Sequence, residues 1–354
     1  MILHLAWSGR IGGIERLLEG IVRSADAGTG YVHRACLLDG RGSIGDRLVE
    51  EGLAVRLGFR SGYDARGLWR LARLLRRLRP TVIHVHSHAV AAYLVALAVC
   101  PKAVRVYTEH SPRALRRDRK FRLLYFLLRR SVATFVATTA GMAATLAKKR
   151  VERERIAVIP NGVPVPSRLA RTEAGDPPVV GVVARLERQK RVDLFLDVLA
   201  ELRRRGVATA GLVVGDGSLR RDLMRQADAL GLRESVEFAG EQEDTVPWLD
   251  RLDVFLMTSE FEPFGMAALE AMARGAAVVA MPCPGGLTEV VGGGGIVLPS
   301  REVQDAADAV QHLLASPRER ARLRAQGAVV AEEHSFERVV VRLDELYRSL
   351  QRLC

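Results

Sequence analysis

The segment Ser259–Gly275 (SEFEPFGMAALEAMARG) carries two carboxylates, Glu262 and Glu270, eight residues apart. A strand is predicted to end just before it, so Glu262 falls in the loop beyond a strand's carboxyl end, where α/β proteins bind ligands. A helix is predicted to begin near Met266, after Gly265, and the free N–H groups of its first turn suit a phosphate. The segment indicates a ligand site or, with equal weight, an acidic helix start followed by a solvated glutamate.

Two further segments carry residues suited to phosphate. In GVVARLERQKR (181–191), a buried strand is followed by a loop that places Arg185 and Lys190 before a helix. Two cations at a strand's carboxyl end can neutralise a leaving diphosphate, although a single basic loop residue is usually only solvated. LVVGDGSLRRDL (212–223) reads as a strand, a Gly-Asp-Gly turn and a helix, and its glycines fit a tight turn as well as a ligand site.

His84, His86 and His88 alternate, so on a strand they would point to one side, as metal ligands can. No carboxylate lies near them in the sequence, and the chain lacks the Asp-x-Asp pair that often assists Mg²⁺. We therefore predict no metal site, and a reaction that needs neither a metal ion nor a cofactor.

Short apolar runs alternate with longer amphipathic runs, which predicts doubly wound α/β units. Strands of a first sheet are predicted at Ile2–Trp7, Val82–Val85, Arg105–Thr108 and Thr134–Ala137. Strands of a second sheet are predicted at Val179–Ala184, Gly211–Val214, Val236–Ala239, Val254–Thr258 and Ala277–Ala280. Helices are predicted between the later strands at Asp193–Arg204, Ser218–Ala229 and Pro263–Arg274.

A length of 354 residues suggests two domains. The proline-containing stretch Asn161–Pro178 is the predicted linker. The predicted domains are therefore residues 1–165 and residues 166–335. A last helical pattern, Phe336–Leu353, lies within residues 336–354 and is expected to pack back onto the first domain.

The net charge of +12 is distributed unevenly. Residues 1–165 hold 29 Lys+Arg and 12 Asp+Glu (+17), whereas residues 166–354 hold 24 and 29 (−5). The first half is therefore expected to meet an anionic membrane, nucleic acid or phosphorylated ligand. Two arginine-rich segments, Arg66–Arg79 and Arg113–Arg130, motivate a peripheral membrane contact. In the first, Arg66, Arg70, Arg73 and Arg77 share one helix face, opposite a leucine face.

Cysteine usage indicates a reducing compartment. Cys36, Cys100, Cys283 and Cys354 are scattered and form no Cys-x-x-Cys pair, which predicts neither a zinc site nor a disulfide framework. The first residues show no signal-peptide pattern. The longest apolar stretch, Ala89–Cys100, is too short to span a bilayer. We expect a cytoplasmic protein, with possible peripheral contact with the cytoplasmic face of the membrane.

Taken together, the motifs resemble those of GT4-type retaining glycosyltransferases of the GT-B fold. RLERQK, GDGSLRRDL, VEFAG, EPFGMAALEAMARG and PGGLTEVV occur in that family's order, and RIGGIERLL, TVIHVHSH, VYTEHS and IPNGV extend the resemblance to the first half. It thus covers nearly the whole chain. It implies an α/β protein with two Rossmann-like domains facing each other across a cleft, the first on the acceptor side and the second binding the donor.

The resemblance also implies roles for individual residues. The expected catalytic residues are His110 beside the sugar, Arg185 and Lys190 on the diphosphate, and Glu262 on the hydroxyls of the donor sugar. The other expected donor contacts are Gly12 and Gly13 in the first loop, the N–H groups of Phe264, Gly265 and Met266, Glu270 on the ribose, and Glu289 in a closing loop. The chain departs from the family at Pro263, where glycine is frequent, and at Arg274, where a small residue is common.

The expected activity is transfer, with retention, of a sugar from a UDP- or GDP-sugar to an acceptor. The expected acceptor is a lipid-linked glycan intermediate of cell-surface or exported polysaccharide synthesis. Two alternatives remain: a GT-B nucleotide-sugar epimerase-like enzyme and a basic nucleic-acid-binding protein. An aromatic content of 5% and the lack of RNP, zinc or helix-turn-helix signatures count against the second, so no nucleic-acid partner is expected.

Overall fold

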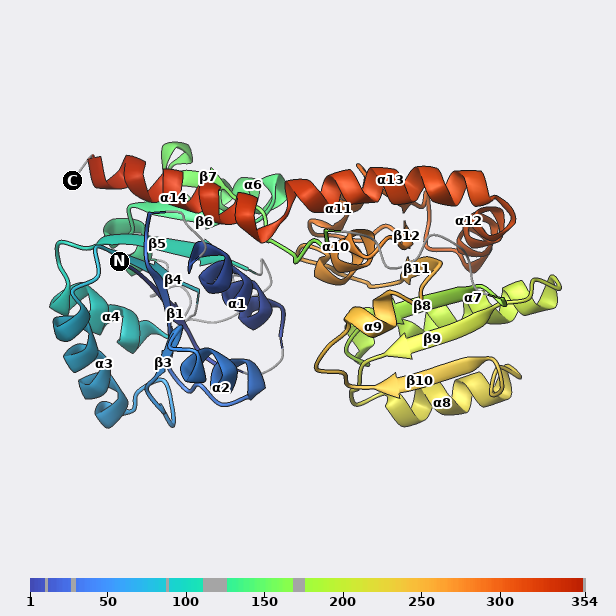
Figure 1. Ribbon diagram of the computed structural model, residues 1–354, viewed down its shortest axis with the longest axis horizontal. Coiled ribbons are helices and arrows are strands. Elements are labelled where there is room, and N and C mark those ends of the chain that lie inside the picture. Colours follow the sequence, from blue (N-terminus) through green and yellow to red (C-terminus); the bar gives the residue numbers. More distant parts are fainter. Residues whose placement is uncertain (10–11, 27–29, 87–88, 111–125, 168–175, 353–354) are drawn as a thin grey trace. The chain divides into compact units, whose positions relative to one another are not determined.

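The computed structural model describes the chain except residues 10–11, 27–29, 87–88, 111–125, 168–175 and 353–354 (Figure 1). The chain divides into two compact units. Unit 1 comprises Met1–Gly162 and Phe336–Cys354, and unit 2 comprises Val163–Ser335. Most of the arginine-rich segment Arg113–Arg130, and residues 168–175 of the predicted linker, lie outside the described residues.

Unit 1 contains a seven-stranded parallel sheet in the order β3-β2-β1-β4-β5-β6-β7. Its strands are β1 (Ile2–Ala6), β2 (His33–Leu37), β3 (Ala54–Arg56), β4 (Val82–Val85), β5 (Val104–Glu109), β6 (Thr134–Ala137) and β7 (Ile156–Val158). The sequence did not predict β2, β3 and β7, because they are short or carry polar residues such as His33 and Arg34.

Helices cover both faces of this sheet. They are α1 (Gly13–Asp26), α2 (Ser43–Glu50), α3 (Ala65–Leu78), α4 (Val90–Val99), α6 (Ala140–Lys148) and α14 (Phe336–Arg352), with a 3₁₀ turn η1 (Arg153–Arg155). Along β1, Leu3 and Leu5 belong to one buried cluster and Ile2 to another, shared with α1 and α14, as strand alternation requires. His4 therefore lies on the α1 and α14 side of the sheet.

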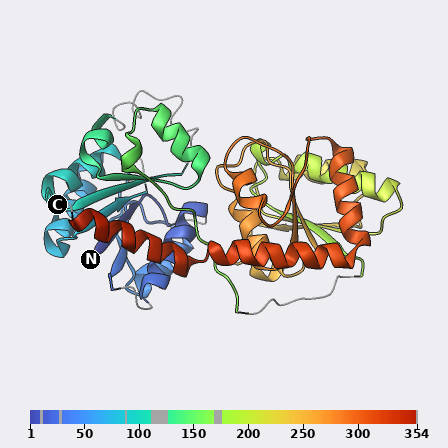
Figure 2. The same ribbon diagram turned by 90° about the horizontal axis from the view of Figure 1, so that it is seen from above.

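The last helix of the chain, α14, is part of unit 1 and packs against α1. Figures 1 and 2 show it running alongside the sheet. Phe336 anchors its first turn: a Cβ on Gly20 would lie 2.1 Å from the Phe336 ring, and one on Gly162 would lie 2.6 Å away. Only glycine at these two positions leaves room for the ring.

Helix α3 has the two faces that the sequence predicts. Leu71 and Leu75 are fully buried, and Arg66, Arg70, Arg73 and Arg77 are exposed. Asp64 caps the helix by accepting hydrogen bonds from the N–H groups of Arg66 and Gly67. Among the described residues, no helix is long and apolar enough to cross a membrane.

Unit 2 contains a six-stranded parallel sheet in the order β10-β9-β8-β11-β12-β13. Its strands are β8 (Val179–Val183), β9 (Ala210–Val214), β10 (Val236–Gly240), β11 (Val254–Met257), β12 (Ala277–Ala280) and β13 (Ile296–Val297). Its helices are α7 (Val192–Arg204), α8 (Arg220–Ala229), α9 (Val246–Leu249), α10 (Met266–Ala273), α11 (Leu287–Val291), α12 (Val303–Ala315) and α13 (Pro317–Glu333), with a 3₁₀ turn η2 (Arg188–Lys190).

Helices α8 and α10 begin later than the helical patterns Ser218–Ala229 and Pro263–Arg274, although α10 begins at Met266, the start predicted from Gly265. Helix α10 begins at Met266 and not at Pro263, because Gly265 has a φ of 105° and cannot continue a right-handed helix. Helix α8 begins at Arg220 and not at Ser218, after the Gly-Asp-Gly turn. In both cases a loop occupies the residues that were predicted to form the first helical turn.

Both sheets reverse their strand order at one point, next to their first strand. In unit 1 the reversal lies between β1 and β4, and in unit 2 it lies between β8 and β11. In open α/β sheets, ligands bind beyond the carboxyl ends of the strands at such switch points. The loops after these four strands are therefore where a ligand is expected to bind.

Candidate active site

At the switch point of unit 2, Lys190 and Glu262 form an ion pair. Lys190 lies in η2, after β8, and Glu262 lies in the loop after β11. Lys190 Nζ lies 2.6 Å from Glu262 Oε2, and the two side chains are 16% and 10% exposed. The structure thus brings together two of the predicted catalytic residues, close enough to solvent for a ligand to reach them.

Hydrogen bonds between the two loops hold this pair in place. The Glu260 N–H donates to the carbonyl of Gln189 (2.8 Å), and Gln189 Nε2 donates to the carbonyl of Phe261 (2.8 Å). The Thr258 hydroxyl donates to the carbonyl of Lys190 (3.2 Å). The positions of Lys190 and Glu262 are therefore set by the backbone of both loops as well as by their mutual attraction.

The Glu262 backbone is also fixed from the loop after β12. Its N–H donates to the carbonyl of Pro284 (3.1 Å), and its carbonyl accepts from the N–H of Gly286 (3.0 Å). Gly285 has a φ of 127°, and a Cβ there would lie 1.8 Å from the Glu262 carbonyl oxygen. Gly285 must therefore be glycine for this contact to form.

Arg301, which sequence reasoning missed, joins the ends of β11 and β12. Its guanidinium donates to the carbonyls of Thr258 (2.7 Å), Ser259 (2.8 Å) and Pro282 (3.1 Å). A loop arginine far along the chain gives no signal of this role in the sequence. Near this arginine, burial first, and then the charge of Glu262, raises the pKa of the Cys283 thiol.

The start of α10 presents backbone N–H groups beside this pair. Gly265 caps the helix without a side-chain hydrogen bond, and a Cβ on it would lie 2.8 Å from Leu287 Cδ1. Phe264 is buried against His334, with ring centroids 6.0 Å apart. Met266 begins the helix and Glu270 lies half-buried within it. The first helical turn therefore has N–H donors of the kind that bind phosphate.

Arg185 is exposed; its carbonyl accepts from the N–H of Glu187 (2.8 Å), which leaves the guanidinium directed to solvent-accessible surface. Nearby, both carboxylate oxygens of Glu187 accept from Ser218, from its N–H (3.0 Å) and its hydroxyl (2.7 Å), which lowers the pKa of Glu187. A Cβ on Gly215 would lie 1.9 Å from the Ala184 carbonyl oxygen. The Gly-Asp-Gly turn thus serves close packing between two loops, the simpler of its two interpretations.

Two other unit 2 residues singled out in the sequence lie outside the Lys190–Glu262 pair. Glu289 is exposed in the first turn of the short helix α11. Arg274 donates from Nε and Nη2 to the two carboxylate oxygens of Asp250, at 2.5 and 2.6 Å. The departure from the family at Arg274 therefore has a structural partner within unit 2.

In unit 1, Gly12 and Gly13 follow β1, and His110 follows β5. Helix α1 begins at Gly13, and a Cβ on Gly12 would lie 2.5 Å from Glu15 Oε2. His110 Nε2 lies 3.2 Å from His86 Nδ1. The predicted residues of this unit thus sit at the carboxyl ends of its strands, at and beside the switch point.

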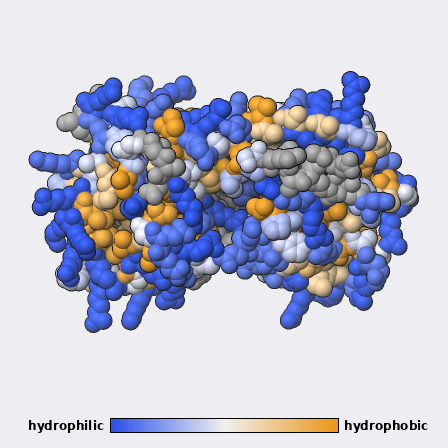
Figure 3. Space-filling view, viewed as in Figure 1, coloured by the Kyte–Doolittle hydropathy of each residue, from blue (hydrophilic) through white to orange (hydrophobic). Residues whose placement is uncertain are grey.

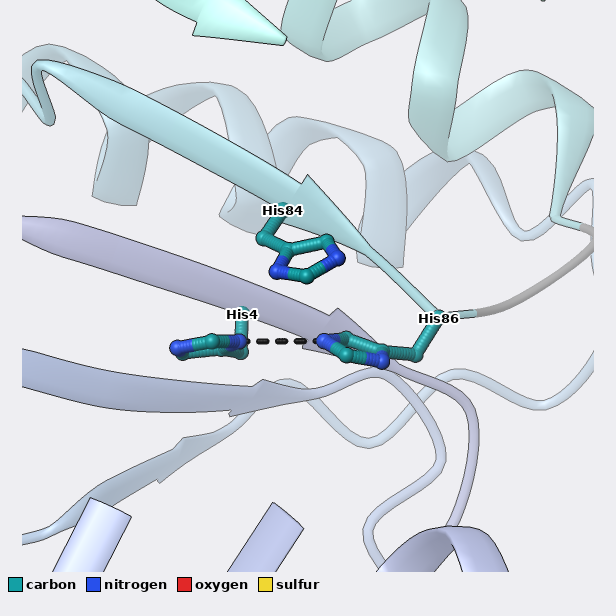
Figure 4. A group of neighbouring side chains, drawn as sticks. All are labelled: His4, His84 and His86. Atoms are coloured by element: carbon teal, nitrogen blue, oxygen red, sulfur yellow. Dashed lines mark hydrogen bonds between the residues drawn. The ribbon is translucent and has the colours of Figure 1, made fainter. Parts of the chain in front are cut away.

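His4, His84 and His86 form a compact buried cluster in unit 1 (Figure 4), and one ring nitrogen of each histidine lies within 4.8 Å of one nitrogen of each of the other two. His88 lies outside the described residues. His4 Nδ1 lies 3.0 Å from His86 Nε2, and the two nitrogens of His84 bond to Tyr347 Oη and Thr108 Oγ1, each at 2.6 Å. Protein groups thus already occupy these ring nitrogens. The expectation of no metal site stays a prediction.

Burial lowers the pKa of all three rings well below 6.5, and the neighbouring histidines lower it further. The cluster is therefore uncharged at neutral pH. That His4 joins this cluster could not be predicted from a local pattern, because His4 lies 82 residues from His86 in the chain.

Models of two families match the chain. The model described as "Glycosyltransferase Family 4" matches residues 11–165, and the model described as "Glycosyl transferases group 1" matches residues 168–329. Together they cover most of both units. These matches favour an enzyme over the nucleic-acid-binding alternative.

Curated relatives are similar over part of their length. The chain is 31% identical to an alpha-D-kanosaminyltransferase of Streptomyces kanamyceticus over 49% of this chain, and spans 46% of that relative. It is 32% identical to the lipopolysaccharide core biosynthesis glycosyltransferase LpsE of Rhizobium meliloti over 59% of this chain and 61% of the relative.

A solved structure is similar over nearly the full length. The crystal structure of Anabaena Alr3699/HepE in complex with UDP and glucose has a TM-score of 0.81 and 20% sequence identity, and the match covers 98% of this chain and 99% of that one. At this identity the likeness concerns the fold. On the two family models and this fold, the chain belongs to the GT4-type glycosyltransferases and has the GT-B fold.

Proposed function

We propose that this glycosyltransferase uses a nucleoside diphosphate sugar, a UDP- or GDP-sugar, as its donor, and that unit 2 binds it. The observation that carries the proposal is the Lys190–Glu262 pair at the β8/β11 switch point. A cation and a carboxylate held side by side match the two parts of such a donor, the anionic diphosphate and the hydroxyl-rich sugar.

The cations act on the bond that breaks. Cleavage of a sugar–phosphate bond leaves negative charge on the diphosphate and positive character on the anomeric carbon. Lys190, Arg185 and the N–H groups at the start of α10, from Phe264 to Met266, stabilise the diphosphate charge. Lys190 and the N–H groups are held in place before the reaction. The exposed side chain of Arg185 is available to a ligand from solvent.

The carboxylates orient the donor. Glu262 accepts from Lys190 through Oε2, and a carboxylate has further acceptor capacity for sugar hydroxyls. Glu270 is assigned to the ribose and Glu289 to the nucleotide side of the site. In unit 1, Gly12 and Gly13 allow close approach of a ligand to the backbone, and His110 is assigned to the sugar.

The proposed stereochemical course is retention. The acceptor attacks on the face from which the diphosphate leaves, and a diphosphate oxygen takes the acceptor's proton. No side chain forms a covalent bond to the sugar, and no metal ion is needed. Analysis of the product's anomeric configuration by NMR tests this step, and an inverted product would contradict it.

The proposed acceptor is a lipid-linked glycan intermediate of cell-surface or exported polysaccharide synthesis. The similarity to LpsE, whose name places it in lipopolysaccharide core synthesis, supports this class. The charge of +17 on residues 1–165 and the exposed arginines of α3 support contact with anionic lipid on the cytoplasmic face of the membrane, at about 1 kcal/mol per basic residue. The face drawn in Figure 3 is mostly hydrophilic, with apolar patches between the hydrophilic residues.

Donor binding is tested by thermal unfolding with UDP, GDP and their sugars. A bound nucleotide at 100 times its Kd adds about 2.7 kcal/mol of stability. We expect one nucleotide series to stabilise the protein, and Lys190→Ala to abolish most of the effect. Glu237→Ala, which removes an exposed ion pair with Arg251, is the matched control and should respond like the parent protein. No stabilisation by either series would contradict the proposal.

Membrane contact is tested by sedimentation with anionic vesicles at low salt. We expect the protein to bind, and the combined replacement of Arg66, Arg70, Arg73 and Arg77 by glutamine to weaken binding at least tenfold. Replacement of exposed unit 2 arginines, Arg204, Arg225, Arg233 and Arg322, gives a control of equal charge change. Equal binding by both variants would contradict a role for α3.

A further inference from the structure

A line of hydrogen-bonded groups runs through unit 1 from α14 to the end of β5. Asp344 Oδ1 lies 2.9 Å from His33 Nε2, and His33 Nδ1 lies 3.0 Å from His4 Nε2. His4 Nδ1 lies 3.0 Å from His86 Nε2, the contact drawn in Figure 4, and His86 Nδ1 lies 3.2 Å from His110 Nε2. In each link, the Nε2 atom of one ring lies next to the carboxylate oxygen of Asp344 or to the Nδ1 atom of the preceding ring.

The geometry of the rings fits a continuous line. The histidines come from β2, β1, the end of β4 and the end of β5, which are neighbours in the sheet in that order. Successive rings are tilted by only 27°, 32° and 26°, with centroids 5.2, 5.2 and 5.5 Å apart. Such rings point their nitrogens at one another and do not stack face to face.

The line has a direction. A neutral imidazole has one N–H donor and one acceptor nitrogen, whereas an ionised carboxylate can only accept. Burial keeps His4 and His86 neutral by lowering their pKa. When the His33 ring carries a single proton and donates it from Nε2 to Asp344, His33 Nδ1 accepts from His4, and the same assignment passes to His86 and His110. Each ring then carries its proton on Nε2, and Nδ1 is the acceptor nitrogen of His110.

We propose that Asp344 is a positioning residue that fixes the tautomer of His110 through three buried histidines. The carboxylate at one end of the line thereby decides which His110 nitrogen can accept a hydrogen bond at the other end. The consequence for catalysis, that Nδ1 of His110 accepts from a sugar hydroxyl, rests on the proposed function. The assignment of the His110 tautomer does not depend on the proposed function.

A metal ion bound by His4, His84 and His86 is the competing interpretation. It would require the His4–His86 contact to break, together with the bonds of His84 to Tyr347 and Thr108. The line accounts for the observed contacts without that rearrangement. Elemental analysis of the purified protein separates the two, because one bound metal per chain that is lost in His84→Ala would overturn the proposal.

Variants at Asp344 test the line from its far end. Asp344 Oδ2 is buried and has no hydrogen-bond partner within the described residues. In Asp344→Asn, the amide can place its oxygen there and donate to His33 Nε2, which would reverse every donor in the line. Asp344→Leu removes the acceptor without supplying a donor. Tyr347→Phe is the matched control, since it alters a buried polar group on the same helix that bonds His84 and not the line.

The measurement is the protonation of each ring nitrogen in the full chain, from long-range ¹H–¹⁵N spectra of protein labelled with ¹⁵N-histidine. His110→Gln assigns the His110 signals. In the parent protein we expect His33, His4, His86 and His110 to be protonated on Nε2. Asp344→Asn should move the His110 proton partly or wholly to Nδ1, Asp344→Leu should give a mixture of tautomers, and Tyr347→Phe should leave His110 unchanged.

Three results would overturn the proposal: a His110 protonated on Nδ1 in the parent protein, an unchanged His110 in both Asp344 variants, or an equal change in Tyr347→Phe. With the tautomers as expected, Asp344→Asn should lower kcat about tenfold with little change in KM for the donor. An unchanged kcat would overturn the catalytic consequence alone. Absence of any transfer by the parent protein would count against the proposed function and leave the tautomer result standing.

Discussion

The two units share a strand order but carry different chemistry at the switch point. At β8/β11 of unit 2, a charged pair, Lys190 and Glu262, lies within reach of solvent. At β1/β4 of unit 1, the corresponding region holds neutral, buried histidine rings. Topology therefore decides where polar groups gather, whereas residue type and burial decide what they can do.

The physical difference is desolvation. Lys190 is held beside Glu262 with part of its side chain exposed, so this cation can meet charge that develops during a reaction. Rings removed from water lose their charged form and can offer only directed hydrogen bonds. Unit 2 is thus suited to electrostatic stabilisation, and unit 1 is suited to positioning.

The largest effect should come from removing the charges in unit 2. Lys190→Ala is expected to lower kcat/KM about 100-fold, and Glu262→Gln by at least tenfold, because each removes a preorganised group from the reacting atoms. Steady-state transfer assays measure both. Glu237→Ala serves again as the control. Rates near those of the parent protein would show that the charged switch point is not the reaction centre.

The next effect should be a loss of stability in unit 1 at acid pH. His4, His84 and His86 have a lowered pKa in the folded protein, so below about pH 6.5 the unfolded chain binds more protons than the native state. Stability is therefore expected to be full above that pH and to fall as the pH decreases, by up to about 1.4 kcal/mol per pH unit for each ring.

Tryptophan fluorescence can follow the two units separately. Trp7 and Trp69 report on unit 1 and Trp248 on unit 2, so Trp248→Phe and the Trp7→Phe/Trp69→Phe pair isolate the signals. We expect the unit 1 signal to show the steeper loss of stability between pH 7 and pH 5. An equal pH dependence of stability in the two signals would contradict the proposed difference in buried histidines between the units.

A smaller effect should follow from disturbing the loop that holds Glu262. Gly285→Ala combines a positive φ with a clash against the Glu262 carbonyl, and should cost about 2–3 kcal/mol and lower activity several-fold. Gly206→Ala has a φ of 75° but no atom within 4 Å of the added Cβ, so it isolates backbone strain at about 1 kcal/mol. Thermal unfolding and activity assays are the measurements. Equal effects at both glycines would mean that the contact with Glu262 is unimportant.

The smallest effect should appear at Arg274. The side chains of Arg274 and Asp250, which form an ion pair, are 15% and 21% exposed. Because the pair is half-buried, Arg274→Ala should lower the free energy of unfolding by about 1 kcal/mol. Activity should stay within twofold of the parent protein, because the pair is structural. Denaturant unfolding checks the first expectation and transfer assays check the second. A large loss of activity would make this departure from the family functional.

The sequence predicted the four central strands of the first sheet and five strands of the second, since buried strands of parallel sheets are continuous apolar runs. It missed short β3, β7 and β13, where too few residues carry a pattern, and β2, where His33 and Arg34 interrupt it. The position of Gly265 correctly predicted that α10 begins at Met266, whereas the broader helical pattern Pro263–Arg274 placed the start three residues too early.

By itself, the sequence determined the α/β architecture, the family and the set of residue types at the strand ends, because periodicity and motif order are local properties of the chain. Only the tertiary structure decided which of them meet. Lys190 reaches Glu262 across 72 residues, and Asp344 reaches His33 across 311. Both contacts depend on the reversal of strand order and the return of α14 to unit 1, which bring distant segments together through packing that no local pattern encodes.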